Sequence, residues 1–313
     1  MKQLLSMTML ALSALTFQAE GAITLSTEAA KGTTVKMLLN TVSATAPVTV
    51  DWGDGVDMKY TINPSQGSYN RWVEGAVSGS QITVSGKVTE FKMTGAAITG
   101  VTVEYMSDLK KLELQDNKIE TFELKSYSPI ETLNLKNNNI YNSPGVNSTL
   151  GLENCAAHLT DLNLSGNTSL TCLDVRSLET ITTLSINDCP NFASIFICAP
   201  EESQATLKYI YINNCSPSNF YPVSLPSLRK LELDNNGLMS DGTTSPFEMG
   251  DYPELTWLSL KGNKYLSSID LSKSPLLEQM WIDHCAFESI NVSVCPELIT
   301  LNCGYNNIES IDL

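Results

Sequence analysis

The chain has 313 residues, enough for one large or two ordinary domains with a buried core. Its formal net charge of −15 argues against a nucleic-acid or anionic-membrane partner, because phosphate-binding surfaces need clustered Lys and Arg. Charged residues make up only 17% of the chain and form no run of one sign, so the acidity is spread over a solvated surface.

Residues 1–22 have the pattern of a secretory signal peptide. Lys2 supplies the positive charge, Leu4–Phe17 the apolar segment, and Ala19 and Ala22 the small residues of a cleavage site. The apolar segment is shorter than the ~20 residues of a membrane anchor, and no later segment is long and apolar enough to span a bilayer. We therefore expect an exported protein without a membrane span, either secreted or held in the periplasm or at the cell surface.

Residues 23–87 are expected to form a small antiparallel β domain that caps the chain. Short β-branched segments alternate there with Gly, Ser, Asn and Pro. The segment Pro47–Gly55, PVTVDWGDG, predicts a strand that runs into a tight hairpin turn, where glycine adopts positive φ angles. This hairpin resembles that of PKD-type immunoglobulin-like domains.

Three aspartates of this hairpin, Asp51, Asp54 and Asp57, have two interpretations. Carboxylates at this spacing can bind calcium, or they can accept hydrogen bonds from the backbone N–H groups of the turn. The second interpretation is preferred, and we predict no metal site and no cofactor.

Residues 88–313 consist of copies of one pattern. The segment Leu109–Leu124, LKKLELQDNKIETFEL, reads as L-x-x-L-x-L-x-x-N-x-L, and the pattern recurs at intervals of 21 to 29 residues. Such a period predicts a solenoid, because one repeat cannot bury its own leucines and must stack on its neighbours. The repeats begin at Val88, Leu109, Ile130, Leu159, Ile181, Leu207, Leu228, Leu255, Leu277 and Leu298.

The pattern resembles the leucine-rich repeat family. The resemblance implies a mostly β solenoid of about ten repeats, with a parallel sheet on its concave face. Each x-L-x-L-x segment is expected to form a short strand whose leucines point inward while the x residues face outward. The short repeats leave little room for helix, so second apolar pairs such as Phe122 and Leu124 predict extended or 3₁₀ segments on the return side.

The ninth position of the pattern holds asparagine or cysteine in nearly every repeat. A buried amide at this position can hydrogen-bond the turn backbones of neighbouring repeats and form a ladder, in which a cysteine thiol is a small substitute. Cys189, Cys215 and Cys285 occupy this position. Export favours disulfides, but ladder positions favour free thiols, so a Cys189–Cys215 bridge is the less favoured alternative.

Three repeats carry extra residues, in Tyr141–Ala157, Ala199–Ala205 and Met239–Pro253. Insertions in a solenoid form loops. These loops are expected either to frame a binding face or to be tolerated surface variation.

The sequence contains no constellation for catalysis. Its two histidines, His158 and His284, lie in different repeats, so no Ser-His-Asp or Cys-His arrangement is indicated. No phosphate loop or nucleotide-binding glycine pattern is present. We therefore predict a protein that is not an enzyme and has no catalytic residues.

The outward strand positions predict a recognition surface instead. Their N-terminal half is expected to be small and polar, whereas the C-terminal half carries aromatic side chains. Exposed Trp and Tyr on a rigid sheet provide contact area at low entropic cost, although the rings can equally pack on one another. The candidate ligand-binding residues are Tyr209, Tyr211, Trp257, Trp281, His284 and Tyr305.

These features predict an exported, non-catalytic binding protein whose partner is a protein or peptide. Segments like the PKD-type hairpin precede leucine-rich repeats in exported proteins of Bacteroidetes-like bacteria, and that resemblance implies adhesion or host contact. The alternatives are a glycan-binding surface protein and a structural component of the envelope. The chain stops at Leu313, inside its last repeat. We expect that edge to pair with a second subunit, to be covered by a partner, or to continue in a longer natural chain.

Overall fold

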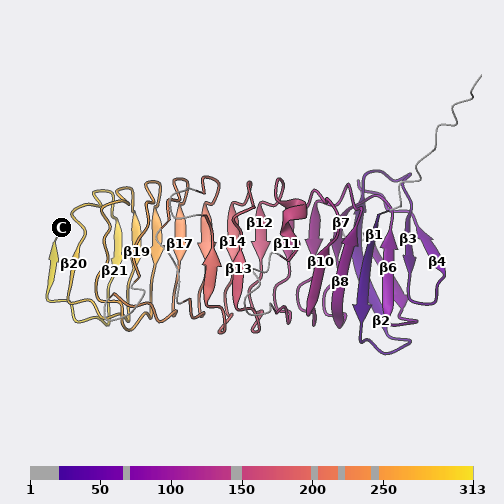
Figure 1. The fold of residues 1–313 in the computed structure, drawn as a ribbon, viewed down its shortest axis with the longest axis horizontal. Coiled ribbons are helices and arrows are strands. Elements are labelled where there is room, and N and C mark those ends of the chain that lie inside the picture. The colour runs from indigo at the N-terminus through magenta and orange to yellow at the C-terminus, as the bar shows by residue number, and fades with distance from the viewer. Residues whose placement is uncertain are drawn as a thin grey trace, which may run out of the picture.

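The computed structural model describes residues 21–65, 71–141, 150–198, 204–217, 223–240 and 247–312. The predicted signal peptide falls almost entirely outside these residues. Figure 1 shows short strands stacked side by side along a nearly straight long axis, with the antiparallel strands at one end and the C-terminus at the other. Helix is scarce in the described residues, where a 3₁₀ turn, η2, spans Leu152–Cys155. The predicted mostly β solenoid is confirmed.

One strand of each repeat contributes to a parallel sheet, whose outward side we call the ladder face. Neighbouring strands pair at the same position of the repeat, so that Leu112 lies opposite Leu133, and Leu133 opposite Leu162. Ten such strands enclose about nine turns. In stacking order they are β7 (Val88–Lys92), β9 (Lys111–Glu113), β11 (Thr132–Asn134), β12 (Asp161–Asn163), β14 (Thr183–Ser185), β16 (Tyr209–Tyr211), β17 (Lys230–Glu232), β18 (Trp257–Ser259), β19 (Gln279–Trp281) and β21 (Thr300–Asn302).

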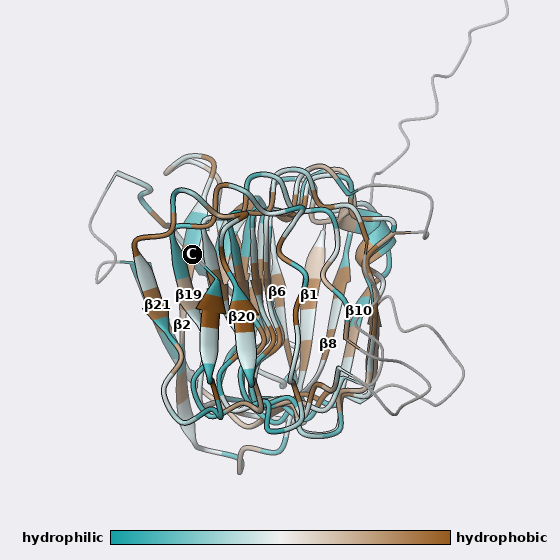
Figure 2. Cartoon of the chain, turned by 90° about the vertical axis from the view of Figure 1, so that its left-hand side faces the viewer, coloured by the Kyte–Doolittle hydropathy of each residue, from teal (hydrophilic) through white to brown (hydrophobic). Residues whose placement is uncertain are grey.

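The leucines of these strands point inward, as predicted. Leu112, Leu133 and Leu184 have no exposed surface, and Leu162 is 1% exposed. Viewed along the long axis, the turns of the coil lie one behind another, and apolar residues recur in the strands (Figure 2). The buried side chains form one continuous cluster from Ile23 in the cap to Cys295.

The return side of the coil carries shorter runs of parallel strands. β10 (Thr121–Leu124) pairs with β8 (Ile98–Glu104), β13 (Cys172–Asp174) with β15 (Ser194–Phe196), and β20 (Ser289–Asn291) with β22 (Ser310–Asp312). The prediction of extended return segments is confirmed for these repeats.

The N-terminal strands continue both layers of the solenoid. On the ladder side the order β5-β2-β7 extends the parallel sheet, while β4-β3-β6-β1-β8 extends the return side. β7 is the changeover strand, because it pairs antiparallel with β2 and parallel with β9. The remaining cap strands are β1 (Ala22–Thr27), β2 (Thr34–Thr41), β3 (Val48–Asp51), β4 (Asp57–Tyr60), β5 (Trp72–Ala76) and β6 (Gln81–Ser85).

The Asp51 carboxylate organises the hairpin turn of the cap. Its Oδ1 accepts hydrogen bonds from the backbone N–H groups of Gly53, Asp54 and Gly55 at 2.8, 3.1 and 3.0 Å. The preferred interpretation of Asp51 as a turn carboxylate is therefore confirmed. Within the described residues, no three His, Cys, Asp or Glu side chains are grouped as metal ligands.

The predicted asparagine ladder joins the turns that follow the ladder strands. The Nδ2 of Asn138 donates to the carbonyl oxygens of Leu114 and Leu135 at 3.0 and 2.9 Å, and its Oδ1 accepts from the N–H of Ile119 at 3.0 Å. One side chain thus satisfies backbone groups of two successive turns. This satisfaction matters because unpaired polar groups in the core are costly.

In some repeats a cysteine thiol takes the place of the asparagine side-chain amide in the ladder. The Sγ of Cys215 donates to the Ile186 carbonyl at 2.9 Å, and that of Cys285 to the Leu260 carbonyl at 3.2 Å, the contacts that asparagine makes elsewhere. Cys189 and Cys215 are separate thiols, so the less favoured disulfide is absent. A hydrogen bond between their side chains raises the pKa of Cys215.

The three long segments are described only at their ends. Residues 142–149, 199–203 and 241–246 fall outside the described residues. At the end of the first segment, Gly151 lies against the backbone of Leu124 in β10, where an added Cβ would stand 3.1 Å from it. This end therefore lies on the return side, opposite the ladder face that the loop was expected to frame.

The ladder predicts a contrast between two adjacent asparagines. Asn138→Ala leaves the buried Ile119 N–H without its partner and takes one of two side-chain donors from the Leu114 and Leu135 carbonyls, which keep hydrogen bonds from Asn117 and Asn167. We therefore expect a loss of about 1–3 kcal/mol in the free energy of unfolding. Asn139 is exposed in the same turn, and Asn139→Ala should cost less than about 0.5 kcal/mol. Urea titration of both variants measures the difference, and equal losses would contradict the ladder's role.

Candidate recognition surface

Four neighbouring strands bring the predicted aromatic residues together. β16 carries Tyr209 and Tyr211, while β18 and β19 carry Trp257 and Trp281. Strand register places Tyr209, Lys230 and Trp257 in one row across the sheet. All of these side chains face outward because the residues between them are leucines or other apolar residues of the core.

Lys230, on the strand between them, joins the tyrosine and tryptophan rings. Its Nζ lies 5.4 Å from the ring centroid of Tyr211 and 4.3 Å from that of Trp257. The same Nζ forms an ion pair with Glu232 at 2.9 Å. An ammonium over an aromatic face is attracted by the ring quadrupole, so this lysine holds two rings in a line.

The tryptophan pair extends this line. The rings of Trp257 and Trp281 are stacked, with centroids 4.1 Å apart and an interplanar angle of 26°. We call Tyr211, Lys230, Trp257 and Trp281 the aromatic stripe. All four residues are half-buried. The alternative expectation that the rings pack on one another therefore describes the tryptophans well, and what remains open to a partner is their outer surface.

Burial affects two polar groups of the stripe, the indole N–H of Trp257 and the phenol of Tyr211. The indole Nε1 of Trp257 is buried and has no hydrogen-bond partner among the described residues. Burial raises the pKa of the Tyr211 phenol, so this ring stays neutral well above physiological pH. Beside the stripe, Tyr209 is 37% exposed and presents its ring to solvent.

His284 and Tyr305 form a second group, at the turns that follow β19 and β21. Their rings are stacked with centroids 4.2 Å apart and an interplanar angle of 20°. Both residues have positive φ angles, 59° and 56°. The His284 Nδ1 lies 3.0 Å from Oδ2 of Asp283. The six predicted residues thus form two groups, one on the strands and one at the turn edge.

The first strands of the ladder face carry a network of charges, so the prediction of a small, polar N-terminal half is wrong there. The Lys111 Nζ lies 3.6 Å from Glu90 and 3.2 Å from Glu113, and Arg71 pairs with Glu90 at 2.9 Å. The pairing of Arg71 could not be predicted, because Arg71 precedes β5 and reaches this face only through the fold of the cap.

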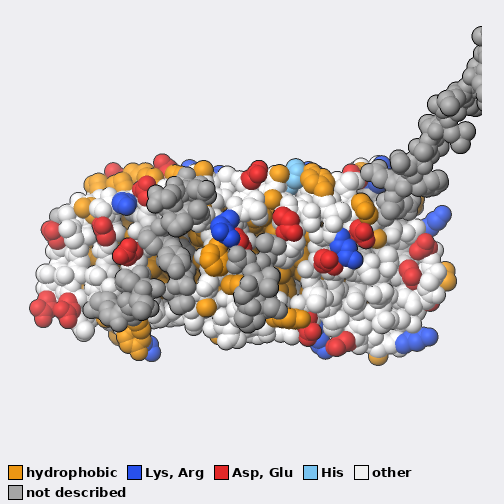
Figure 3. Space-filling model, in the orientation of Figure 1, with side chains coloured by type: hydrophobic (Ala, Val, Ile, Leu, Met, Phe, Trp, Pro, Cys, Tyr) orange, Lys and Arg blue, Asp and Glu red, His pale blue; other side chains and the backbone are white. Residues whose placement is uncertain are grey.

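Charges of both signs are interspersed elsewhere on the molecule. On the face drawn in Figure 3, acidic and basic side chains alternate and no large basic patch is visible. This distribution agrees with the low charged fraction of 17% and the net charge of −15. Nowhere in the described parts of the chain does a helix have the length and hydropathy needed to cross a membrane.

Two solved structures are similar to this chain at low sequence identity. The functional domain of InlJ from Listeria monocytogenes, which includes a cysteine ladder, is 15% identical with a TM-score of 0.44, over 76% of this chain and 58% of that domain. A leucine-rich repeat protein of Leptospira interrogans is 15% identical with a TM-score of 0.38, over 66% of this chain and 67% of that protein. The chain thus matches less than two thirds of the InlJ domain, and these similarities concern the fold alone.

Searches by sequence gave a different result. Neither the models of known protein families nor the curated proteins contain a match to this chain. The description of the solenoid therefore rests on its own repeats, strand register and buried leucines.

The position of Lys230 yields a stability prediction. Lys230→Met keeps the aliphatic stem but removes the charge that lies over two rings, so we expect a loss of about 1 kcal/mol in unfolding free energy. Lys261→Met is the control, because it removes an ion pair with Asp234 at 3.3 Å in the turns that follow β18 and β17. The control should change stability by less than about 0.5 kcal/mol. Equal losses of unfolding free energy in Lys230→Met and Lys261→Met, measured by chemical denaturation, would show that the contact of Lys230 with the rings adds no stability beyond that of an ion pair.

Proposed function

We propose that this chain is an exported, non-catalytic binding protein that recognises a protein or peptide on its ladder face. The observation that carries the proposal is the aromatic stripe, where Lys230 lies between Tyr211 and Trp257, and Trp257 stacks on Trp281. Large rings held by their neighbours have little conformational entropy left to lose on binding. An extended repeat surface also suits a large ligand.

The unpaired indole N–H of Trp257 supports this proposal. A buried donor without an acceptor costs about 1–3 kcal/mol. A small rotation of the ring toward a carbonyl or hydroxyl group of a ligand recovers part of that cost. Tyr209, 37% exposed in the same row, provides the accessible edge of the site.

Export and surface location support a role in adhesion or host contact. They rest on the signal-peptide pattern of residues 1–22 and on the resemblance of the PKD-like hairpin and repeats to exported bacterial proteins. The buried Trp52 of that hairpin donates from Nε1 to the Tyr60 hydroxyl at 3.1 Å, so the motif also stabilises the cap.

Glycan recognition is the second candidate, favoured by the same rings. The exposed ring of Tyr209 and the outer surfaces of the tryptophans can stack on the apolar faces of sugars. A purely structural envelope protein would bind no ligand saturably at this surface.

The test compares three alanine variants in two binding assays. A displayed library of random peptides and a glycan array are both applied to the purified protein. Binders to the stripe should lose at least about tenfold in affinity with Tyr209→Ala and Trp281→Ala. Tyr265→Ala is the matched control, because Tyr265 is 60% exposed and lies outside the strand rows.

The readouts separate the candidates. Peptide binding lost in Tyr209→Ala and Trp281→Ala, with unchanged melting temperature, supports the proposal. The same loss on the glycan array supports the second candidate. Binding that survives both substitutions, or no saturable binding in either assay, would overturn the aromatic stripe as a site.

A further inference from the structure

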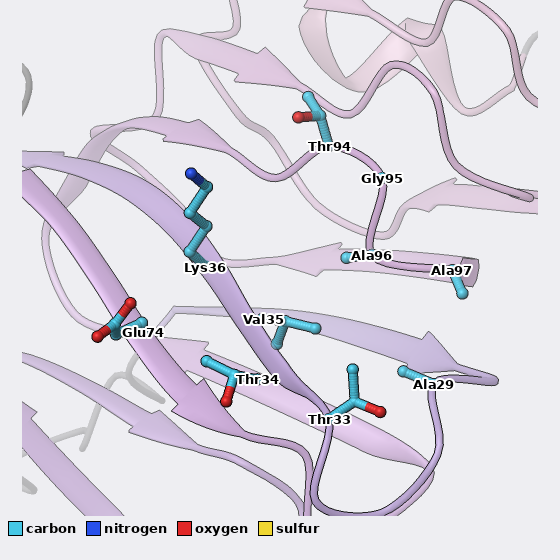
Figure 4. Close-up of a pocket in the computed structure, with 10 residues that line it drawn as sticks. All are labelled: Ala29, Thr33, Thr34, Val35, Lys36, Glu74, Thr94, Gly95, Ala96 and Ala97. Carbon is cyan, nitrogen blue, oxygen red and sulfur yellow. The ribbon is translucent and has the colours of Figure 1, made fainter.

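A pocket of about 400 Å³ opens where the cap meets the first turn of the solenoid. One wall is the first half of β2, Thr34 to Lys36, and the other is the turn Thr94–Ala97 that follows β7 (Figure 4). This pocket lies at the opposite end of the sheet from the aromatic stripe. It is therefore a different site from the one proposed above.

The pocket exists because two neighbouring strands separate. β2 and β7 pair from Thr41 to Leu38, where Leu38 lies opposite Lys92, and the pairing stops there. β2 nevertheless continues as a strand to Thr34, held on its other side by β5. The continuation of β7 leaves β2, so the first half of β2 is paired with no described strand on that side.

The turn after β7 is held away by the solenoid. The N–H groups of Met93 and Gly95 donate to the carbonyls of Glu113 and Asp116, each at 3.0 Å. The Asn117 side chain accepts from the Ala96 N–H and donates to the Met93 carbonyl, both at 2.9 Å. The turn after β7 is therefore hydrogen-bonded to the next repeat of the coil and cannot also pair with β2 in the cap. The gap between β2 and this turn is the result.

Successive residues of β2 direct their backbone N–H and C=O groups to alternate sides of the strand, which shows which of these groups face the gap. Val77 donates its N–H to the Thr33 carbonyl at 2.9 Å, so Thr33 directs its carbonyl at the β5 side. Hydrogen-bonded and non-hydrogen-bonded pairs alternate in an antiparallel ladder. Thr34 and Lys36 consequently direct their N–H and C=O groups into the pocket, where none has a partner in the described part of the chain.

We propose that this pocket binds an extended peptide segment of another molecule, which adds as a strand antiparallel to β2 in the place that β7 vacates. An unpaired strand edge is a template for strand addition, in which main-chain hydrogen bonds provide affinity and alternate side chains provide specificity. The edge from Thr34 to Lys36 accommodates about three residues at ~3.3 Å each.

The walls define the side chains that such a peptide should carry. Val35 and Ala96, 8% and 5% exposed, form an apolar floor that suits a small apolar residue pointing inward. The exposed Lys36 and Glu74 flank the outer side, where they suit polar residues. A sequence that alternates valine with threonine meets both requirements.

The test uses a synthetic capped hexapeptide of alternating valine and threonine with the full-length mature protein. Amide resonances of Thr34 and Lys36 should shift on titration. In the proposed register the threonines direct their backbone toward β2, so N-methylation of the threonines should weaken binding by about tenfold or more. Equal binding of the methylated peptide would overturn the proposed strand addition.

Two variants at one position test the same edge from the protein side. Lys36→Pro removes the N–H that faces the pocket but leaves the hydrogen bonds to β5, because those belong to Val35 and Met37. We expect Lys36→Pro to lose peptide binding and Lys36→Thr to keep it, with similar thermal unfolding. Binding that survives Lys36→Pro, or that is lost equally in both variants, would overturn the proposal. Should Lys36→Pro unfold the cap, the methylated peptide on the unchanged protein remains decisive.

Tyr209→Ala serves as a further control. It changes the ladder face beside the aromatic stripe but not the pocket, so binding of the valine–threonine peptide should be unchanged. Loss of that binding in Tyr209→Ala would place the peptide on the ladder face and contradict the site described here. Failure of either site therefore leaves the other one testable.

Discussion

The structure depends on leucine side chains that no single turn of the chain can bury. Leu112, Leu133 and Leu184 have no exposed surface only because each lies between turns on both sides. The same stacking also buries backbone polar groups, which then need hydrogen-bond partners in the core. The side chains of Asn138 and Cys215 provide them, so the ladder is a consequence of the same burial.

The same stacking determines what the outer surface can do. Parallel strands in register stand about 4.8 Å apart, which brings residues from successive repeats into contact. Tyr211, Lys230 and Trp257 form a line for this reason, although they belong to three different repeats. At the N-terminal end this pairing stops, because β7 and the turn that follows it cannot pair along their whole length with both β2 of the cap and the next repeat of the coil. The unpaired edge of β2 is the result.

The repeat pattern predicted the ladder strands, their register and their buried leucines, because these features follow from local periodicity and stacking. It also predicted which side chains face outward, including Tyr209 and Trp281. The position of Lys230 between two rings depends on side-chain rotamers that no pattern reports. The ion pair of Arg71 with Glu90 and the gap beside Lys36 depend on how distant strands of the cap pair. Hairpin signals such as DWGDG do not contain that information.

The most direct measurement is amide hydrogen exchange after Leu184→Ala, with Thr183→Ala as the outward-facing control in the same strand. Removing the buried side chain should cost about 2–5 kcal/mol locally. In a coil where each turn contacts its neighbours, protection should fall most in β14, then in β12 and β16, and least in the cap strands. An equal fall in every strand from β1 to β21 would instead indicate a single cooperative globule and contradict this account.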